Sequence, residues 1–150
     1  MFQLSKEDCL RCQIGILNGR RGEHLKFLPY YDSIRMVSRL ITQAKSELLI
    51  IDPYADATLL DILSEKAPGV TVRLVCKDRG KPTASEIAKF NKQYKGLTVS
   101  YSDDFHDRFV IVDNAELHNF GSSVNCLGRR LTTYTTRDAR EIKKLLSQLP

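Results

Sequence analysis

A histidine, an aspartate and an arginine stand at the entrance to an unbroken apolar run in the segment HDRFVIVD, residues 106–113. Residues two apart in a strand point to the same face, so His106 and Arg108 are expected to project together at one end of a sheet. An arginine guanidinium grips phosphate oxygens with paired hydrogen bonds, and a histidine beside it can attack phosphorus or transfer a proton. The spacing therefore favours a phosphodiester site, with Asp113 orienting or supporting it.

A buried strand with solvated ends is the plainer interpretation of the same segment. Asp113 is followed by Asn114, and this pair commonly ends a strand in a turn. His118 lies in the next expected strand, where we expect a half-buried, hydrogen-bonded histidine rather than a member of the site. The segment GSS at 121–123 follows in order, and a convergent polar set is what a site requires, so the phosphate interpretation is favoured.

These residues resemble the HxKxxxxD motif of the phospholipase D superfamily. His106 matches its histidine and Asp113 its aspartate, whereas Arg108 stands where that family has lysine. The resemblance covers Asp32 to about Arg130. It also includes the segment IIDPY at 50–54, similar to a strand-ending segment of the family, and GSSVN at 121–125, similar to its GSxN motif. The phosphate-binding residues that this second motif implies, with Asn125 one position further from the glycine than in GSxN, are Ser122, Ser123 and Asn125.

The resemblance implies a two-step phosphoryl transfer that needs no metal or other cofactor and passes through a phosphohistidine on His106. A second histidine must protonate the leaving group, because one imidazole cannot easily be nucleophile and general acid in the same step. Short members of the family supply it by forming homodimers, and a twofold axis does bring a residue near its own copy. The sequence therefore predicts a homodimeric phosphodiesterase, with nucleic acid preferred over lipid as the substrate.

A binding module is the alternative function. The DPY and HDR segments are also similar to the phospholipase D-like C-terminal domains of MIT-domain proteins. That resemblance implies a module that holds acidic phospholipid headgroups, or nucleic acid, without cutting them. It predicts salt-sensitive binding that depends on Arg108 and survives the loss of His106.

Periodicity predicts an α/β layered sandwich whose mixed sheet is flanked by helices. Helices alternate with short apolar strands in the first part of the chain, and close strands follow in the second part. Tyr54, after the first strand, is expected to cap the core rather than line a cleft. Expected helices begin near Asp32, Asp56 or Thr58, Thr83 and Asp138, and expected strands span 48–51, 70–76, 97–101, 108–113 and 116–120.

Length and composition fit one soluble domain. The chain has 150 residues, of which 42% are hydrophobic and 27% charged, and its net charge is +5. This basic balance allows a polyanionic partner without demonstrating one. We interpret 1–150 as a single domain in which residues 1–30 form an extension that the resemblance does not explain; a short strand at 12–17 is the one element expected there.

Cysteines and terminal patterns point to an intracellular protein without a metal. Cys9 and Cys12 form a CxxC, but a zinc ribbon needs a second such pair and the sequence has none. The first residues lack a signal-peptide pattern, and no apolar run approaches the length of a membrane span. We therefore expect a cytoplasmic location.

Overall fold

Seven strands form one mixed sheet in the order β1-β7-β6-β5-β2-β3-β4. The computed structural model describes residues 24–129 and 131–150. Its strands are β1 (His24–Leu28), β2 (Glu47–Ile51), β3 (Thr71–Cys76), β4 (Leu97–Tyr101), β5 (Arg108–Val112), β6 (Glu116–Phe120) and β7 (Thr132–Arg137). Its helices are α2 (Tyr30–Gln43), α3 (Ala57–Leu63), α4 (Ala84–Gln93), α5 (Arg140–Leu146) and the short 3₁₀ helix η1 (Val124–Cys126).

The sheet is parallel in one half and antiparallel in the other. β2, β3 and β4 run parallel, and α3 and α4 form the crossovers that parallel neighbours require. β5 pairs antiparallel with β2, and β6, β7 and β1 continue antiparallel from it. The prediction of a mixed sheet flanked by helices is therefore confirmed.

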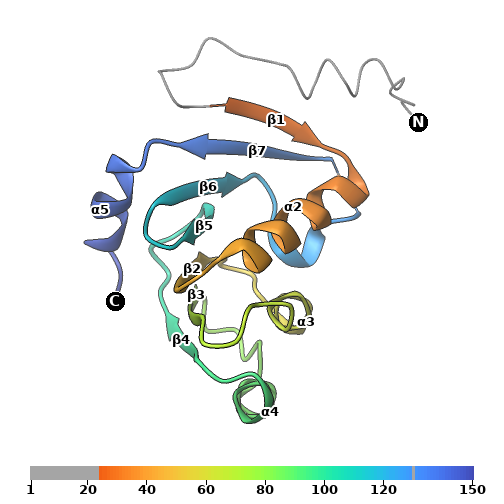
Figure 1. Cartoon of the computed structure of the whole chain (residues 1–150), viewed down its shortest axis with the longest axis vertical. Coiled ribbons are helices and arrows are strands. Elements are labelled where there is room, and N and C mark those ends of the chain that lie inside the picture. The colour runs from red at the N-terminus through yellow and green to blue at the C-terminus, as the bar shows by residue number, and fades with distance from the viewer. Residues whose placement is uncertain (1–23, 130) are drawn as a thin grey trace.

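Two hydrophobic layers pack against opposite faces of the sheet. Figure 1 shows α2, α3 and α4 on one side and α5 on the other. The larger core lies under the three helices, and the smaller core, around Phe109 and Ile142, lies under α5. β2 is buried from Leu48 to Ile51, which explains why its sequence is continuously apolar rather than alternating.

Two of the predicted helix starts are confirmed by their capping bonds. Thr83 accepts a hydrogen bond from the Glu86 amide at 3.2 Å, and the Glu86 carboxylate accepts one from the Thr83 amide at 2.7 Å, which completes the expected capping box of α4. Asp56, one of the two candidates for α3, accepts from the Thr58 amide at 2.9 Å.

The starts of α2 and α5 differ from the prediction. α2 begins at Tyr30, so Asp32 lies in its first turn, where a carboxylate complements the helix dipole, instead of capping it. Asp138 does accept from the Arg140 amide at 2.9 Å, but no capping box forms at α5. The Glu141 carboxylate binds the Arg137 side chain at 2.7 Å instead, because β7 ends beside the helix.

The strands β1 and β7 are additions to the predicted set. β7 has the sequence TTYTTR, whose β-branched residues favour a strand but whose polarity hides the apolar alternation. Its Tyr134 is buried between His118 and Phe120, with ring centroids at 5.8 and 5.2 Å. β1 occupies 24–28, inside the segment predicted to be an extension. The expected strand at 12–17 and the CxxC of Cys9 and Cys12 lie outside the described residues.

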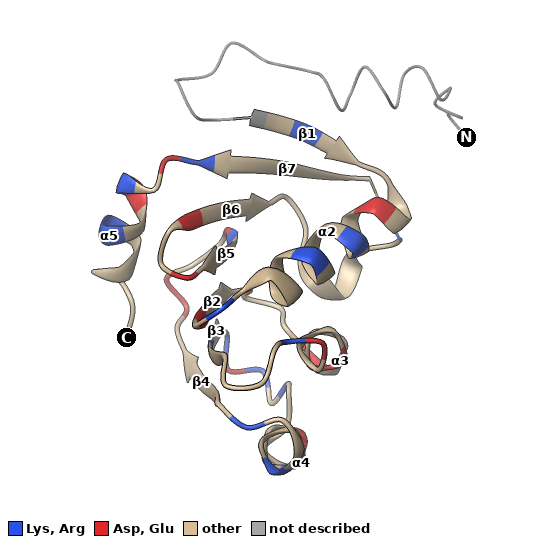
Figure 2. Ribbon diagram, viewed as in Figure 1, with Lys and Arg blue, Asp and Glu red and all other residues tan. Residues whose placement is uncertain are grey.

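Charged residues are distributed over several elements. Figure 2 shows Lys and Arg on β1, α2 and α5 and in loops, with Asp and Glu interspersed among them. The net charge of +5 is therefore not concentrated on one helix. Within residues 24–129 and 131–150, no helix is both long and apolar enough to cross a membrane.

Candidate phosphate site

The antiparallel pairing of β5 with β2 assembles the site at one end of the sheet. Ile51, the last residue of β2, pairs with Phe109 at the start of β5. Arg108 therefore lies beside the turn that follows β2, and its guanidinium carbon is 5.7 Å from the ring centroid of Tyr54. His106 is exposed in the segment just before β5. The two residues lie at the same end of β5, Arg108 as its first residue and His106 just before it.

A buried aspartate ties the turn after β2 to the glycine-serine segment. Asp52 is fully buried, and its carboxylate accepts hydrogen bonds from the Ser123 hydroxyl at 2.9 Å and the Val124 amide at 2.8 Å. The same carboxylate accepts from the Tyr54 amide at 3.1 Å. Sequence reasoning treated Asp52 only as a strand end, whereas it holds two walls of the site together.

The residues of the second motif have different roles. Ser123 is buried and donates its hydroxyl to Asp52, so it holds the loop, while Ser122 beside it is partly exposed. Asn125 donates its amide to the Tyr54 carbonyl at 3.0 Å, and its own Oδ1 is buried without a hydrogen-bond partner among the described residues. Ser122 is therefore the more accessible of the two serines, and the buried Asn125 Oδ1 is an acceptor that the described residues leave unused.

The glycine that opens the second motif is required by a close approach of backbone and side chain. The amide of Gly121 donates to the Thr133 carbonyl at 2.8 Å, which joins the end of β6 to β7. A Cβ at this position would lie 2.1 Å from the Thr133 Oγ1, far inside contact distance. Only glycine lets the chain turn here toward Ser122 and Ser123.

Three cations surround the ring of Tyr54. Lys77 and Arg79, in the loop after β3, place their charged groups 5.7 and 5.0 Å from the ring centroid, and Arg108 reaches it from β5. Tyr54 is 39% exposed, so the expectation that it caps the core is wrong. The Arg108 Nε is buried and has no hydrogen-bond partner in the described part of the chain. The structure therefore gathers three positive charges around one exposed ring, with the Arg108 Nε donor unused.

Sequence reasoning missed Lys77 and Arg79, although a signal was present. The segment KDR at 77–79 directly follows β3, as DPY at 52–54 directly follows β2. Carboxyl ends of adjacent parallel strands meet at one edge of a sheet, so the two segments had to be neighbours once β2 and β3 paired in parallel. Which strands pair is decided by the tertiary structure, so the sequence alone did not place KDR beside DPY.

No family model matches the sequence, and no curated protein matches it either. Among solved structures, Nuc from Salmonella typhimurium, a phospholipase D family member, superposes with a TM-score of 0.63 at 18% identity, covering 83% of this chain and 89% of that one. The chain has a phospholipase D-like fold.

Two further structures share the phospholipase D-like fold. NucT from Helicobacter pylori has a TM-score of 0.63 at 14% identity and covers 83% of this chain and 91% of its own. TrmBL2, an archaeal chromatin protein with a novel mode of DNA binding, has a TM-score of 0.56 at 18% identity, covering 93% of this chain and 54% of that one. The fold predicted from the resemblance is confirmed.

Asp113 lies at the other end of β5 from His106. Its carboxylate accepts hydrogen bonds from the amides of Lys45, Ser46 and Glu47 at 2.8–3.1 Å and from the Ser46 hydroxyl at 2.9 Å. With Asn114, it adopts positive φ in the turn between β5 and β6. The structure thus separates Asp113 from the other predicted site residues and gives it the turn role of the plainer interpretation, together with a hold on the chain entering β2.

Acid will weaken the contribution of Asp113 to stability. The hydrogen bonds from Ser46, Glu47 and Lys45 hold the pKa of the Asp113 carboxyl well below its usual range. Because the folded pKa is lowered, the stabilisation is present above the unfolded pKa near 4 and is lost as pH falls toward the folded value. In urea melts at pH 7, 4 and 2.5, Asp113→Asn will be less stable than the unchanged protein at pH 7, and the difference will shrink with acid.

The matched control for this test is Asp61→Asn, an exposed aspartate on α3. We expect this control to change neither the stability at pH 7 nor its dependence on pH. A difference between Asp113→Asn and the unchanged protein that stays constant from pH 7 to 2.5 would contradict the assignment.

His118 is a structural histidine, as expected. It is buried, its Nδ1 lies 2.6 Å from the Tyr134 hydroxyl, and its Nε2 lies 3.1 Å from the Glu116 carboxylate. Burial lowers its pKa, which hydrogen bonding and charge from Glu116 partly oppose. Its two nitrogens are both engaged, so it does not supply the second histidine of a phosphoryl transfer.

Cys76 is no competing nucleophile at this edge. It ends β3 and is buried in the larger core. Burial, together with the Asp52 and Asp78 carboxylates, raises the pKa of its thiol to about 11. The thiol therefore stays protonated at neutral pH, and only the thiolate is strongly nucleophilic.

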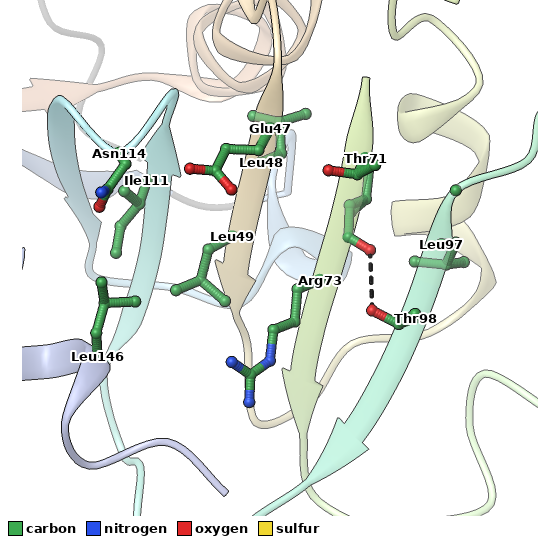
Figure 3. A pocket seen from close by; sticks show the side chains of 12 residues that line it. Glu47, Leu48, Leu49, Thr71, Arg73, Leu97, Thr98, Ile111, Asn114 and Leu146 are labelled. Carbon is green, nitrogen blue, oxygen red and sulfur yellow. Dashed lines mark hydrogen bonds between the residues drawn. The ribbon is translucent and has the colours of Figure 1, made fainter. Parts of the chain in front are cut away.

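A separate hollow of about 500 Å³ lies on the α5 face of the sheet. Figure 3 shows its apolar floor of Leu49, Ile111 and Leu146, with Arg73 beside it. An Arg73 amino group donates to the Pro150 carbonyl. Glu47 and Asn114 line it at the end of the sheet occupied by Asp113, so the hollow is distinct from the site around His106.

Proposed function

We propose that the protein is a phospholipase D-like phosphodiesterase that cleaves nucleic acid, without a metal, as a cytoplasmic homodimer. The observation that carries the proposal is the exposed His106 beside Arg108, whose buried Nε has no partner among the described residues. Ser122, partly exposed, belongs to the loop that Asp52 holds through Ser123 and Val124. An arginine donor, a hydroxyl and an accessible imidazole are the groups that a phosphodiester needs.

His106 would act as the nucleophile. An imidazole nitrogen forms a bond to phosphorus while the bond from phosphorus to the leaving oxygen breaks. A second His106, from another copy of the chain, gives its proton to that oxygen. Water then attacks phosphorus and gives a proton to the second histidine, and the nitrogen–phosphorus bond breaks. Arg108 stabilises the negative charge on the phosphoryl oxygens through both steps.

The homodimer is proposed because, among the described residues, no second histidine lies beside His106. His24 begins β1, which β7 and β6 separate from β5. Asp113 is at the far end of β5, and His118 is buried with both nitrogens engaged. Neither is placed to protonate a leaving group held at Arg108. A twofold axis near His106 would supply the missing acid from a second copy.

Nucleic acid is the substrate class that the site supports best. Lys77 and Arg79 extend the positive charge of Arg108 across the edge of the sheet, which suits a ligand with several phosphates. The similarity in fold to a DNA-binding chromatin protein is consistent with this class.

Cleavage of a fluorescent oligonucleotide in the presence of EDTA tests the proposal. We expect turnover that EDTA does not reduce. When the unchanged protein is mixed and refolded with rising amounts of His106→Ala, activity will fall as the square of the unchanged fraction, because both histidines act on one phosphorus. A linear decline would show that each chain works alone, and no turnover on DNA or RNA would refute the enzymatic proposal.

A non-cutting phospholipase D-like module is the second candidate. The observation that favours it is Arg108, which keeps the phosphate grip but presents a different donor geometry from the lysine of the superfamily motif. Such a module would bind nucleic acid or acidic phospholipid headgroups with strong salt dependence. Arg108→Ala will then weaken binding while His106→Ala leaves it unchanged, and no variant will show turnover.

A further inference from the structure

We infer that Tyr54, Lys77 and Arg79 form a subsite for the nucleotide next to the phosphate held by Arg108, and that this subsite selects single-stranded nucleic acid. The inference rests on the proposed nucleic-acid ligand but not on hydrolysis. It concerns residues outside the two motifs, brought together by the ends of β2 and β3.

Among the described residues, no ion pair neutralises the charges of Lys77, Arg79 and Arg108. The three ion pairs found among residues 24–129 and 131–150 use His118, Arg137 and Arg140. Lys77, Arg79 and Arg108 instead gather within 5.0–5.7 Å of one ring centroid. Like charges this close repel one another, and an anion with more than one phosphate relieves the repulsion. A polynucleotide backbone carries phosphates at regular intervals and fits this need.

Two hydrogen bonds fix the backbone of Tyr54, whose ring lies at the centre of the subsite. The Tyr54 amide donates to Asp52, and its carbonyl accepts from Asn125, at 3.1 and 3.0 Å. The ring is 39% exposed and so remains accessible. When phosphates draw the flexible Lys77 and Arg79 side chains outward, the ring face becomes free for a nucleobase. An unpaired base can stack there, whereas a base in a duplex is already stacked and paired.

Neighbouring residues indicate the course of the strand. Tyr101, 44% exposed, ends β4 opposite Cys76 and offers a second aromatic at the same edge of the sheet. The loop that leads to His106 carries exposed carboxylates, which repel phosphates, at Asp103, Asp104 and Asp107. The strand is therefore expected to approach His106 and Arg108 across the ends of β2, β3 and β4 and to avoid residues 103 and 104.

Fluorescence anisotropy with a 12-nucleotide DNA tests the subsite. All proteins carry His106→Ala so that the strand stays intact, and the same sequence is offered single-stranded and as a duplex. Tyr54→Ala will weaken single-strand binding by about 5- to 100-fold and leave duplex binding unchanged. Tyr54→Phe keeps the ring and will retain single-strand affinity. Arg79→Ala will lower the slope of log affinity against log salt by about one.

Lys143→Ala, an exposed cation on α5, is the matched control and will bind as the parent does. Thermal melts verify that each variant is folded. Equal affinity for the single strand and the duplex, or a single-strand affinity indifferent to Tyr54→Ala, overturns the inference. So does preferential binding to phosphatidylserine vesicles, which would indicate a lipid surface. If single-strand binding depends on Tyr54 but the protein with His106 intact shows no turnover, only the proposed hydrolysis is refuted. If the protein cleaves through His106 but treats single strands and duplexes alike, only the subsite is refuted.

Discussion

Replacement of His106 by alanine will lower the rate of phosphodiester hydrolysis by on the order of a thousandfold or more, because it removes the proposed nucleophile and, in a homodimer, the proton donor as well. The side chain is exposed, so the substitution leaves no cavity and buries no unpaired group. The melting temperature and the affinity for an oligonucleotide should both stay unchanged. Single-turnover cleavage with EDTA present measures the effect on the chemical step.

Asp107→Ala is the matched control for this experiment, since Asp107 is the next residue and is equally exposed. It should retain activity within a few-fold of the unchanged protein. A phosphorylated protein trapped by rapid acid quench, present in the unchanged protein and absent in His106→Ala, would support the intermediate directly. Residual activity within about tenfold of the unchanged protein would rule out His106 as the nucleophile.

Asp52→Ala will cost about 2–4 kcal/mol of the free energy of unfolding. The carboxylate is fully buried and accepts from the Ser123 hydroxyl and from the amides of Val124 and Tyr54. All three donors lose a charged partner, and buried donors left unpaired are the costly ones. The melting temperature should fall by on the order of 10 °C. Oligonucleotide binding should also weaken in the folded variant, because Ser122 and Tyr54 are no longer held.

Asp56→Ala separates this effect from the loss of any aspartate near the site. Asp56 caps α3 through a single hydrogen bond to the Thr58 amide, so its loss should cost about 1 kcal/mol. Asp52→Asn can keep its carbonyl oxygen for Ser123 and Val124, which share one carboxylate oxygen, and would oppose only the Tyr54 amide with its NH2 group, so it should cost less than Asp52→Ala. If Asp52→Ala melts at the same temperature as Asp56→Ala, the bridging role of Asp52 is refuted.

Most helices and strands were predictable from the local sequence, because the signals for them act over a few residues. The apolar run of β2, the capping box at Thr83 and the cap at Asp56 are each readable within one element. β7 was not predicted, because the four threonines and one arginine around Tyr134 show no alternation of apolar residues. Its burial comes from pairing with β6 and with β1, and β1 lies far from it in sequence.

The site was predictable where one strand organises it. Strand alternation predicted His106 and Arg108 on one face, and in the structure Arg108 begins β5 while His106 precedes it by two residues. Asp113 shows the limit of that reasoning, because motif spacing placed it with the histidine while the length of β5 carries it to the opposite edge of the sheet. Adjacency in a motif does not establish adjacency in space.

The sequence by itself determined the α/β class, and it predicted the phosphate site and the strand that carries Arg108. The tertiary structure alone decided that Asp52 holds Ser123, that Lys77 and Arg79 surround Tyr54, and that Asp113 lies elsewhere. The physical reason is distance along the chain. The bond from Ser123 to Asp52 joins residues 71 positions apart, and only the pairing order of the strands brings such residues into contact.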